Sequence, residues 1–206
     1  MNLLIAVPTY ETIVPETFQS IYELDKTGID NVDFKFVKGY DCARARNEIC
    51  KKAIEGEYDF LLMVDSDIIL PKDTLQLLLN DGVEPSELVL GVFPKKNTKK
   101  RETDIFSFNL DTYCDGNRYH MSEFNQLRDK GIKRIAVRGG GFGCALINVS
   151  VLRIMPAPWF IYVTYPNGMV LSEDLYFCSR LRDFAYQVTV DPRIRCGHLT
   201  RLFQYE

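Results

Sequence analysis

The sequence lacks a long apolar run, a basic leader segment and a marked excess of charge of either sign. No run approaches the roughly 20 apolar residues that a membrane-spanning helix needs, so we expect no membrane span. The apolar run from Met1 to Val7 has no basic flank and meets Pro8 at once, which argues for a strand and against a signal peptide. A formal net charge of -3 does not demand nucleic acid or an anionic membrane as a partner.

The sequence also lacks a CxxC pair, and most of its six cysteines lie in apolar stretches. They are Cys42, Cys50, Cys114, Cys144, Cys178 and Cys196. This arrangement argues against a zinc site and a disulfide framework, and it favours reduced, buried thiols. We therefore expect a cytoplasmic protein.

The composition is that of an ordinary globular enzyme, with 46% hydrophobic and 26% charged residues. A chain of 206 residues is long enough for one domain with its own core. The sequence has no internal repeat, no low-complexity tract and no clear linker. We therefore predict a single domain that spans residues 1–206.

Short apolar runs alternate with amphipathic stretches through the first half of the chain. The spacing predicts strands over residues 3–7, 34–37, 60–64 and 88–93, and helices over residues 15–24, 42–54 and 71–79. Asp41 is expected to cap the second of these helices. The alternation predicts an α/β fold in which helices cover both faces of a mainly parallel central sheet, a Rossmann-like three-layer sandwich.

The second half of the chain is less regular. Residues 94–133 are expected to form a mobile loop followed by surface structure. A glycine-rich bend at 138–143 precedes an apolar strand at 144–147, and its glycines do not have the GxGxxG spacing of a dinucleotide site. Ser172 is expected to cap a helix that runs to about residue 182, and residues 187–190 to form a late strand.

The sharpest functional signal is the turn Asp65-Ser66-Asp67, which lies between two apolar runs. It falls at the carboxyl end of an inner strand, where open α/β sheets bind their ligands. Carboxylates in such a place need a cation or hydrogen-bond donors, and their oxygens suit Mg²⁺ or Mn²⁺. The alternative is a turn in which Asp65 bonds its own backbone.

Two further positions carry groups that suit catalysis or metal binding. Glu173 and Asp174 open the helix after Ser172, and either carboxylate could act as a general base on an attacking hydroxyl. The alternative is that both acids only complement the helix dipole. His198 could complete a Mn²⁺ site that begins with Asp67, or it is a surface histidine near the end of the chain.

The segment Pro8-Thr9-Tyr10-Glu11 ends the first strand, at the position where α/β folds commonly meet a nucleotide. An aromatic ring and a carboxylate there could stack on a base and bond to it, and the plain alternative is a polar loop. Arg44 lies near the start of the second helix, where a guanidinium suits a diphosphate and would otherwise be solvated.

Taken together, these motifs resemble the GT-A glycosyltransferases, especially family-2-like members, over nearly the whole chain. The resemblance rests on Val7-Pro8-Thr9-Tyr10, Ala43-Arg44-Ala45-Arg46-Asn47, Asp65-Ser66-Asp67 as the DXD motif, Gly139-Gly140-Gly141-Phe142-Gly143, Ser172-Glu173-Asp174 and Gly197-His198. The order of the motifs and their positions at strand ends make the set specific. It implies one GT-A domain, with a nucleotide-binding half over about residues 1–93 and an acceptor half over about residues 94–206.

The resemblance also implies a role for each motif. The nucleotide would be held by Pro8, Thr9, Tyr10, Glu11, Arg44, Asp65 and Ser66. The donor sugar would lie against Gly140 and Gly141. The divalent cation, Mn²⁺ or Mg²⁺, would be bound by Asp67, His198 and Asp65. The catalytic base facing the acceptor would be Asp174 or Glu173.

The reaction implied by the resemblance is that of a hexosyltransferase. A sugar would move from a nucleoside-diphosphate sugar, a UDP-sugar in preference to a GDP-sugar, to a hydroxyl of an acceptor glycan, small molecule or protein. The physical chemistry agrees, because a divalent cation offsets the charge on the departing diphosphate while a carboxylate takes the acceptor proton.

Two other functions stay open. One is a glycosyltransferase that acts on modified bases in DNA, which the basic run at 95–101 permits, although such a run is usually a solvated loop. The other is a module that binds nucleotide sugars without catalysis, against which the aspartates, the acidic pair and the histidine argue. A phosphatase of the haloacid-dehalogenase type is disfavoured because Ile69 stands where those enzymes have Thr or Val.

Overall fold

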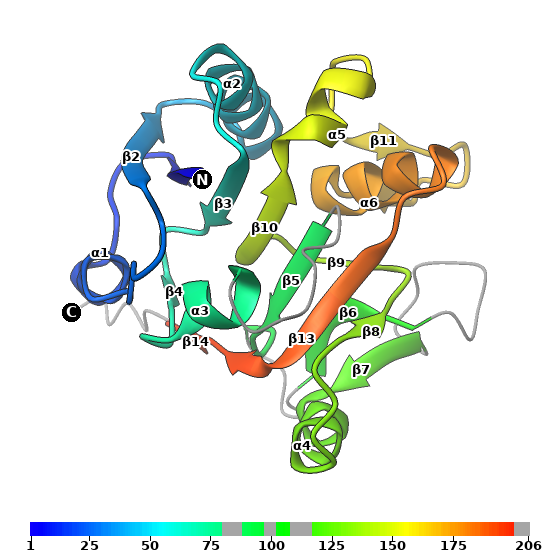
Figure 1. Ribbon diagram of the computed structural model, residues 1–206. Coiled ribbons are helices and arrows are strands. Elements are labelled where there is room, and N and C mark those ends of the chain that lie inside the picture. Colours follow the sequence, from blue (N-terminus) through cyan, green and yellow to red (C-terminus); the bar gives the residue numbers. More distant parts are fainter. Residues whose placement is uncertain (80–87, 97–101, 108–116, 200–206) are drawn as a thin grey trace, which may run out of the picture.

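A seven-stranded sheet forms the centre of the computed structural model, which describes residues 1–79, 88–96, 102–107 and 117–199 (Figure 1). In spatial order its strands are β2 (Asn31–Lys38), β1 (Asn2–Thr9), β3 (Phe60–Val64), β10 (Cys144–Asn148), β5 (Leu88–Val92), β13 (Val188–Arg195) and β8 (Ile135–Ala136). β1 is parallel to β2 and β3, and β13 is parallel to β5. β10 is antiparallel to both β3 and β5, and β8 is antiparallel to β13. The predicted mainly parallel sheet is confirmed.

Helices cover both faces of this sheet, so the predicted three layers are confirmed (Figure 1). One face carries α2 (Cys42–Glu55), α5 (Val149–Ile154) and α6 (Glu173–Asp183), and the other carries α1 (Pro15–Tyr22) and α3 (Thr74–Leu79). The alternation of side chains along a strand produces the two cores. Leu4 joins the cluster of α2 and α6, whereas Leu3 and Ile5 join the cluster of α1 and α3.

The segment expected to be a mobile loop followed by surface structure contains regular elements. The loop expectation is wrong for residues 102–106, which form a strand, whereas the helix that follows has only Phe124 buried and is surface structure as expected. β6 (Glu102–Phe106) pairs with β7 (Arg118–His120) and with β9 (Gly139–Gly140), and α4 (Met121–Asp129) packs against β13. The three residues of β7 are too few to show a period, and the sequence of β6, three polar residues followed by two apolar ones, does not alternate. β6 is stabilised instead by its pairing with β9, which lies far along the chain.

Two small ladders complete the part of the fold that concerns function. β4 (Ile68–Ile69) pairs with β14 (Gly197–His198), so the segment after Asp67 is joined to the C-terminal segment. β11 (Val163–Thr164) pairs with β12 (Val170–Leu171), and this hairpin leads directly into α6.

The two predicted helix caps have different outcomes. The Asp41 side chain accepts a hydrogen bond from the Arg44 backbone N–H at 2.9 Å, so the predicted N-cap of α2 is confirmed. Ser172 occupies the N-cap position of α6, but its side chain makes no capping hydrogen bond. Its hydroxyl donates to the Asp174 carboxylate instead, so the predicted capping role is wrong.

The described cysteines are free thiols, as expected. Cys50, Cys144, Cys178 and Cys196 are buried and Cys42 is partly buried, while Cys114 lies outside the described residues. Across the described ranges, no helix combines the length and apolar character that a membrane crossing requires.

Candidate active site

The turn Asp65-Ser66-Asp67 leaves β3 at the carboxyl edge of the sheet, as predicted, and backbone bonds fix it from three sides. The Asp65 N–H donates to the Gly143 carbonyl at 3.1 Å, and the Ser66 carbonyl accepts from the Val14 N–H at 3.0 Å. The Leu199 N–H donates to the Asp67 carbonyl at 3.0 Å, next to the ladder between β4 and β14. The segment after β14, the glycine-rich bend and the first loop therefore all hold this turn in place.

Asp67 and His198 face one another. The Nδ1 atom of His198 lies 2.7 Å from the Pro94 carbonyl oxygen, and since a carbonyl only accepts, Nδ1 carries a proton. Nε2 lies 3.5 Å from the Asp67 carboxylate. If the ring is neutral, the lone pair of Nε2 points at the Asp67 carboxylate, and the two repel one another. The repulsion disappears when Nε2 binds a proton or when a cation lies between the two groups. One carboxylate and one imidazole fit a divalent cation such as Mn²⁺.

The charges of this pair reinforce one another. Burial by itself would lower the pKa of His198, but the hydrogen bonds to Asp67 and to the Pro94 carbonyl outweigh it and raise that pKa. Burial likewise opposes ionisation of Asp67, yet His198 and Lys96 lower the pKa of the carboxyl below its ordinary value. Without a metal ion both groups thus favour their charged forms, and a cation that binds Nε2 would displace its proton.

Lys96 supplies a third charge, which the sequence analysis did not place here. Its ammonium forms an ion pair with the second oxygen of the Asp67 carboxylate. Lys96 was treated as one member of a solvated basic run, and no local pattern separates it from its neighbours. Residues 97–101 of that run lie outside the described residues.

Arg46 lies at the centre of the site, and the sequence analysis missed it. Its guanidinium reaches the carboxylates of Asp65 at 2.9 Å and Glu173 at 3.1 Å, and only 3% of its side chain is exposed. The guanidinium also lies over the Phe142 ring, 5.3 Å from its centre. Burial disfavours its charge, but Asp65 and Glu173 help to outweigh this and raise the pKa of Arg46.

A signal for Arg46 exists in the sequence of α2. Its buried positions follow helical spacing, and they are Ala43, Ala45, Arg46, Ile49, Cys50 and Ala53. Arg44, which the sequence predicts to hold the nucleotide, lies two positions before Arg46. Positions two apart on a helix differ by about 200°, so the two arginines point to opposite sides. Arg44 lies over the Tyr40 ring at 4.5 Å.

The two acids of α6 are in different surroundings. Glu173 is buried, with 7% of its side chain exposed, and it pairs with Arg46. Asp174 is partly buried and accepts hydrogen bonds from the Ser172 hydroxyl and the Leu175 N–H. Burial raises the pKa of Asp174 to about 6, with Glu173 adding to the rise and Arg46 opposing it.

Asp174 opens into a pocket of about 270 Å³. The pocket is lined by Lys95, Asp104, Phe106, Arg118, Gly141, Ser172, Asp174 and Leu175. A Cβ atom at Gly141 would lie 3.3 Å from the Asp104 Cβ and 3.5 Å from the Asp174 carboxylate, so glycine keeps this wall open. Gly140 does not line the pocket, and a Cβ there would lie 2.5 Å from Ile105.

The predicted nucleotide residues gather only in part. Pro8, Thr9 and Tyr10 line a small pocket of about 120 Å³ together with Tyr40, Cys42 and Ala45. Tyr10 is 73% exposed, which leaves its ring available for stacking. Glu11 is exposed and does not line this pocket. Arg44 lines a neighbouring groove of about 840 Å³ that shares Tyr40 with it.

The three predicted metal ligands do not form a ready-made cluster. Asp67 and His198 come together, but the Asp65 carboxylate is held by Arg46 rather than by its own backbone. Among the residues that the structure describes, no group of three or more His, Cys, Asp or Glu side chains is arranged to hold a metal ion. A cation at Asp67 would therefore take further ligands from a substrate or from water.

No protein-family model matches this sequence, and no curated protein matches it either. A crystal structure of the protein A197 from STIV is similar, with a TM-score of 0.62 and 16% identity over 98% of this chain and 87% of that one. A crystal structure of GalNAc-T7 with UDP, GalNAc and Mn2+ has a TM-score of 0.62 and 10% identity over 97% of this chain and 44% of that one. On these likenesses, the chain has a GT-A-like glycosyltransferase fold.

Proposed function

We propose that this chain is a metal-dependent glycosyltransferase that moves a hexose from a nucleoside-diphosphate sugar to an acceptor hydroxyl. The observation that carries the proposal is that a possible metal site and a possible catalytic base lie at the same edge of the sheet. Asp67 and His198 present a carboxylate and an imidazole nitrogen to one another. Asp174 presents a carboxyl of raised pKa to a pocket. Arg46 connects the two groups, because its guanidinium pairs with Asp65, next to the metal site, and with Glu173, next to Asp174.

Asp67 and His198 are the residues proposed to hold Mn²⁺ or Mg²⁺. When bound, the cation would offset the negative charge that grows on the departing diphosphate. The nucleoside of the donor, a UDP-sugar in preference to a GDP-sugar, would stack on Tyr10 and Tyr40 in the small pocket at the end of β1. The GalNAc-T7 structure contains UDP and Mn2+, which supports this donor class.

Asp174 is proposed as the catalytic base. The acceptor oxygen forms a bond to the anomeric carbon while the bond from that carbon to the diphosphate oxygen breaks. The acceptor proton passes to Asp174, and the electron pair leaves with the diphosphate. A pKa near 6 suits this task, because the group is mostly ionised at neutral pH and still basic enough to accept a proton. Glu173 is buried against Arg46, so we assign it a positioning role.

The test is turnover of a panel of UDP- and GDP-hexoses with Mn²⁺, scored both as hydrolysis and as transfer to sugar, small-molecule and protein acceptors. We expect Asp67→Asn to lose at least about 100-fold in rate, in line with removal of a group that stabilises transition-state charge. Asp73→Asn is the matched control, because Asp73 is exposed. Equal rates in Asp67→Asn and the native protein would contradict the proposal.

The same panel separates the two other functions. Binding of a nucleotide sugar without hydrolysis or transfer in any condition would favour the non-catalytic module. Glycosylation of modified DNA bases gains no support from the basic run, since its described members contact acids of the site. Lys95 lies 4.0 Å from the Asp104 carboxylate and Lys96 pairs with Asp67.

A further inference from the structure

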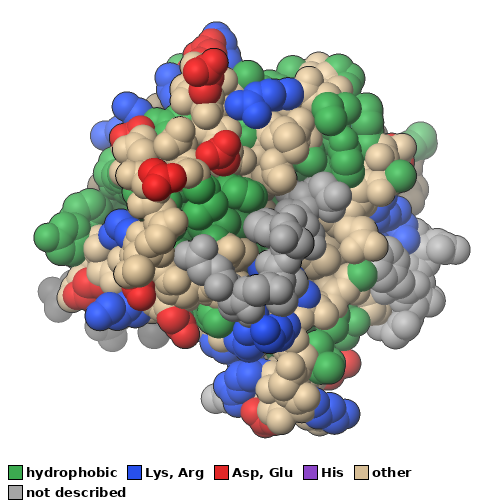
Figure 2. All heavy atoms as spheres, viewed as in Figure 1, with side chains coloured by type: hydrophobic (Ala, Val, Ile, Leu, Met, Phe, Trp, Pro, Cys, Tyr) green, Lys and Arg blue, Asp and Glu red, His purple; other side chains and the backbone are tan. Residues whose placement is uncertain are grey.

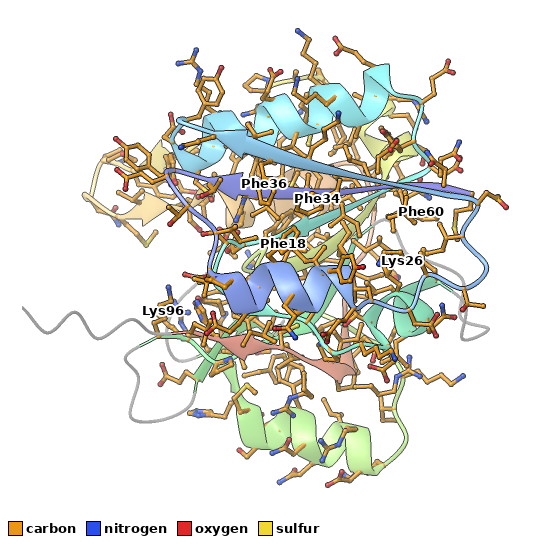
Figure 3. The ribbon with its side chains drawn as sticks, turned by 90° about the vertical axis from the view of Figure 1, so that its left-hand side faces the viewer. Phe18, Lys26, Phe34, Phe36, Phe60 and Lys96 are labelled. Carbon is orange, nitrogen blue, oxygen red and sulfur yellow. The ribbon has the colours of Figure 1, made fainter. Side chains whose placement is uncertain are left out.

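β2 is an edge strand. All eight of its residues pair in parallel with β1, and within the described part of the chain no strand pairs with its other side. An edge strand of this length, without proline, presents a row of backbone donors and acceptors to any strand that can align with it. β2 faces the viewer in Figure 3.

One face of this edge is aromatic. The rings of Phe34 and Phe36 meet edge to face at 4.5 Å, and Phe18 of α1 meets Phe34 at 6.2 Å. Figure 3 shows the three rings side by side between α1 and β2, and Figure 2 shows hydrophobic atoms projecting at the left-hand edge of the molecule, where these elements lie. Phe18 is 46% and Phe36 is 44% exposed, so the two rings present apolar surface to a partner.

The other face of the edge is charged, with Asp33 and Lys35 two residues apart. Side chains alternate along a strand, so these charges share a face that is opposite to the face of Phe34 and Phe36. The Tyr58 hydroxyl donates to the Asp33 carboxylate at 2.5 Å, which fixes its direction. Lys35 is exposed.

We propose that β2 pairs antiparallel with β2 of a second copy of this chain, with Phe34 opposite Phe34. In that register Asp33 of each copy lies opposite Lys35 of the other, so one interface contains this pair twice. Val32 lies opposite Phe36 on the apolar face. Opposite charges directly across a ladder stabilise it, so the edge is complementary to itself.

Neighbouring registers are less favourable. A shift that keeps the same faces together places Asp33 opposite Asp33 or Lys35 opposite Lys35, and like charges across a ladder are destabilising. A slip by one position places Phe34 opposite a charged residue and mixes the two faces. The register centred on Phe34 therefore satisfies both faces at once.

The pairing leaves both candidate sites open. The two copies of β2 run in opposite directions, so the carboxyl edges of the two sheets face away from one another. The dimer does not depend on the proposed function, and the rate per chain should be the same in monomer and dimer. Failure of one proposal can thus be distinguished from failure of the other.

Sedimentation velocity from low micromolar to about 100 μM protein tests the pairing. The native protein should form dimers, and Lys35→Glu should weaken the dimer at least about tenfold, because it turns both charge pairs into repulsions. Asp33→Lys should also weaken the dimer. The double variant that combines Asp33→Lys with Lys35→Glu exchanges the two charges and should restore the dimer. Lys130→Glu, an exposed change in the C-cap of α4, is the matched control and should leave the dimer intact. A monomer throughout this range, or a dimer indifferent to Lys35→Glu, would overturn the proposal.

Oxidative cross-linking tests the register. Phe34→Cys places two thiols opposite one another across the twofold axis, so diamide should join the copies through a disulfide. Phe36→Cys is the control, because residue 36 lies opposite residue 32 and its thiols are too far apart to join. Cross-linking of Phe36→Cys but not of Phe34→Cys would overturn the assigned register.

Discussion

Arg46 gives the most specific prediction, because it is a buried charge with two carboxylate partners. Replacing it with Met keeps an unbranched apolar stem but removes the guanidinium, and with it the charge and the contacts over the Phe142 and Phe160 rings. Glu173 is then left as a buried carboxylate without a cation, whereas the more exposed Asp65 is solvated. Breaking a buried pair in this way costs about 3 kcal/mol.

The cost can be read as a change in thermal stability. For a chain of this size we expect Tm to fall by about 6–12 °C in Arg46→Met, measured by calorimetry at pH 7. Adding Glu173→Gln should recover most of the loss, because the double variant buries no unpaired charge. Arg44→Met, a change at the Tyr40 ring, should stay within about 2 °C of the native protein. A loss below about 2 °C in Arg46→Met, or no recovery in the double variant, would refute the reasoning.

Three other measurements address single residues of the site. The turnover rate should fall about tenfold per pH unit below about pH 6, because burial raises the pKa of Asp174 to about 6 and the protonated carboxyl cannot accept a proton. The turnover rate of Asp174→Asn should not show this dependence on pH. Lys96→Gln should tighten Mn²⁺ binding about tenfold by calorimetric titration, since a competing charge-assisted bond is removed, while Lys95→Gln should bind as the native protein does. Gly140→Ala should lower the free energy of unfolding, measured by urea denaturation, by about 1–3 kcal/mol, because the added Cβ meets Ile105. Gly141→Ala should fold normally but lose turnover.

Sequence periodicity was enough to predict the parts of the fold that depend on local patterns. The continuous apolar runs of β1 and β3 mark strands covered on both faces, and Asp41 marks the start of α2 through a hydrogen bond within one helical turn. The same logic located Asp65 and Asp67, since a polar turn after a buried strand falls at the ligand-binding edge.

The missed features depend on contacts between distant parts of the chain. Arg46 acquires its role from Glu173, which joins it only after α2 and α6 pack on the same face of the sheet. Lys96 acquires its role because β5 ends beside β14, where Pro94 and His198 meet. The helical spacing of α2 marks Arg46 as a buried position, but no local pattern identifies its partner. Ser172 shows the reverse case, because a residue typical of caps donates instead to the neighbouring, partly buried carboxylate of Asp174.

The central claim is that Asp67 and His198 bind a divalent cation at the carboxyl edge of the sheet. Electron spin-echo spectroscopy of Mn²⁺ bound in the presence of UDP tests it directly, because a coordinated imidazole nitrogen modulates the echo. We expect nitrogen coupling in the native protein and in His120→Gln, and its loss in His198→Gln. Coupling that persists in His198→Gln, or that is missing from the native protein, would show that His198 is not a metal ligand.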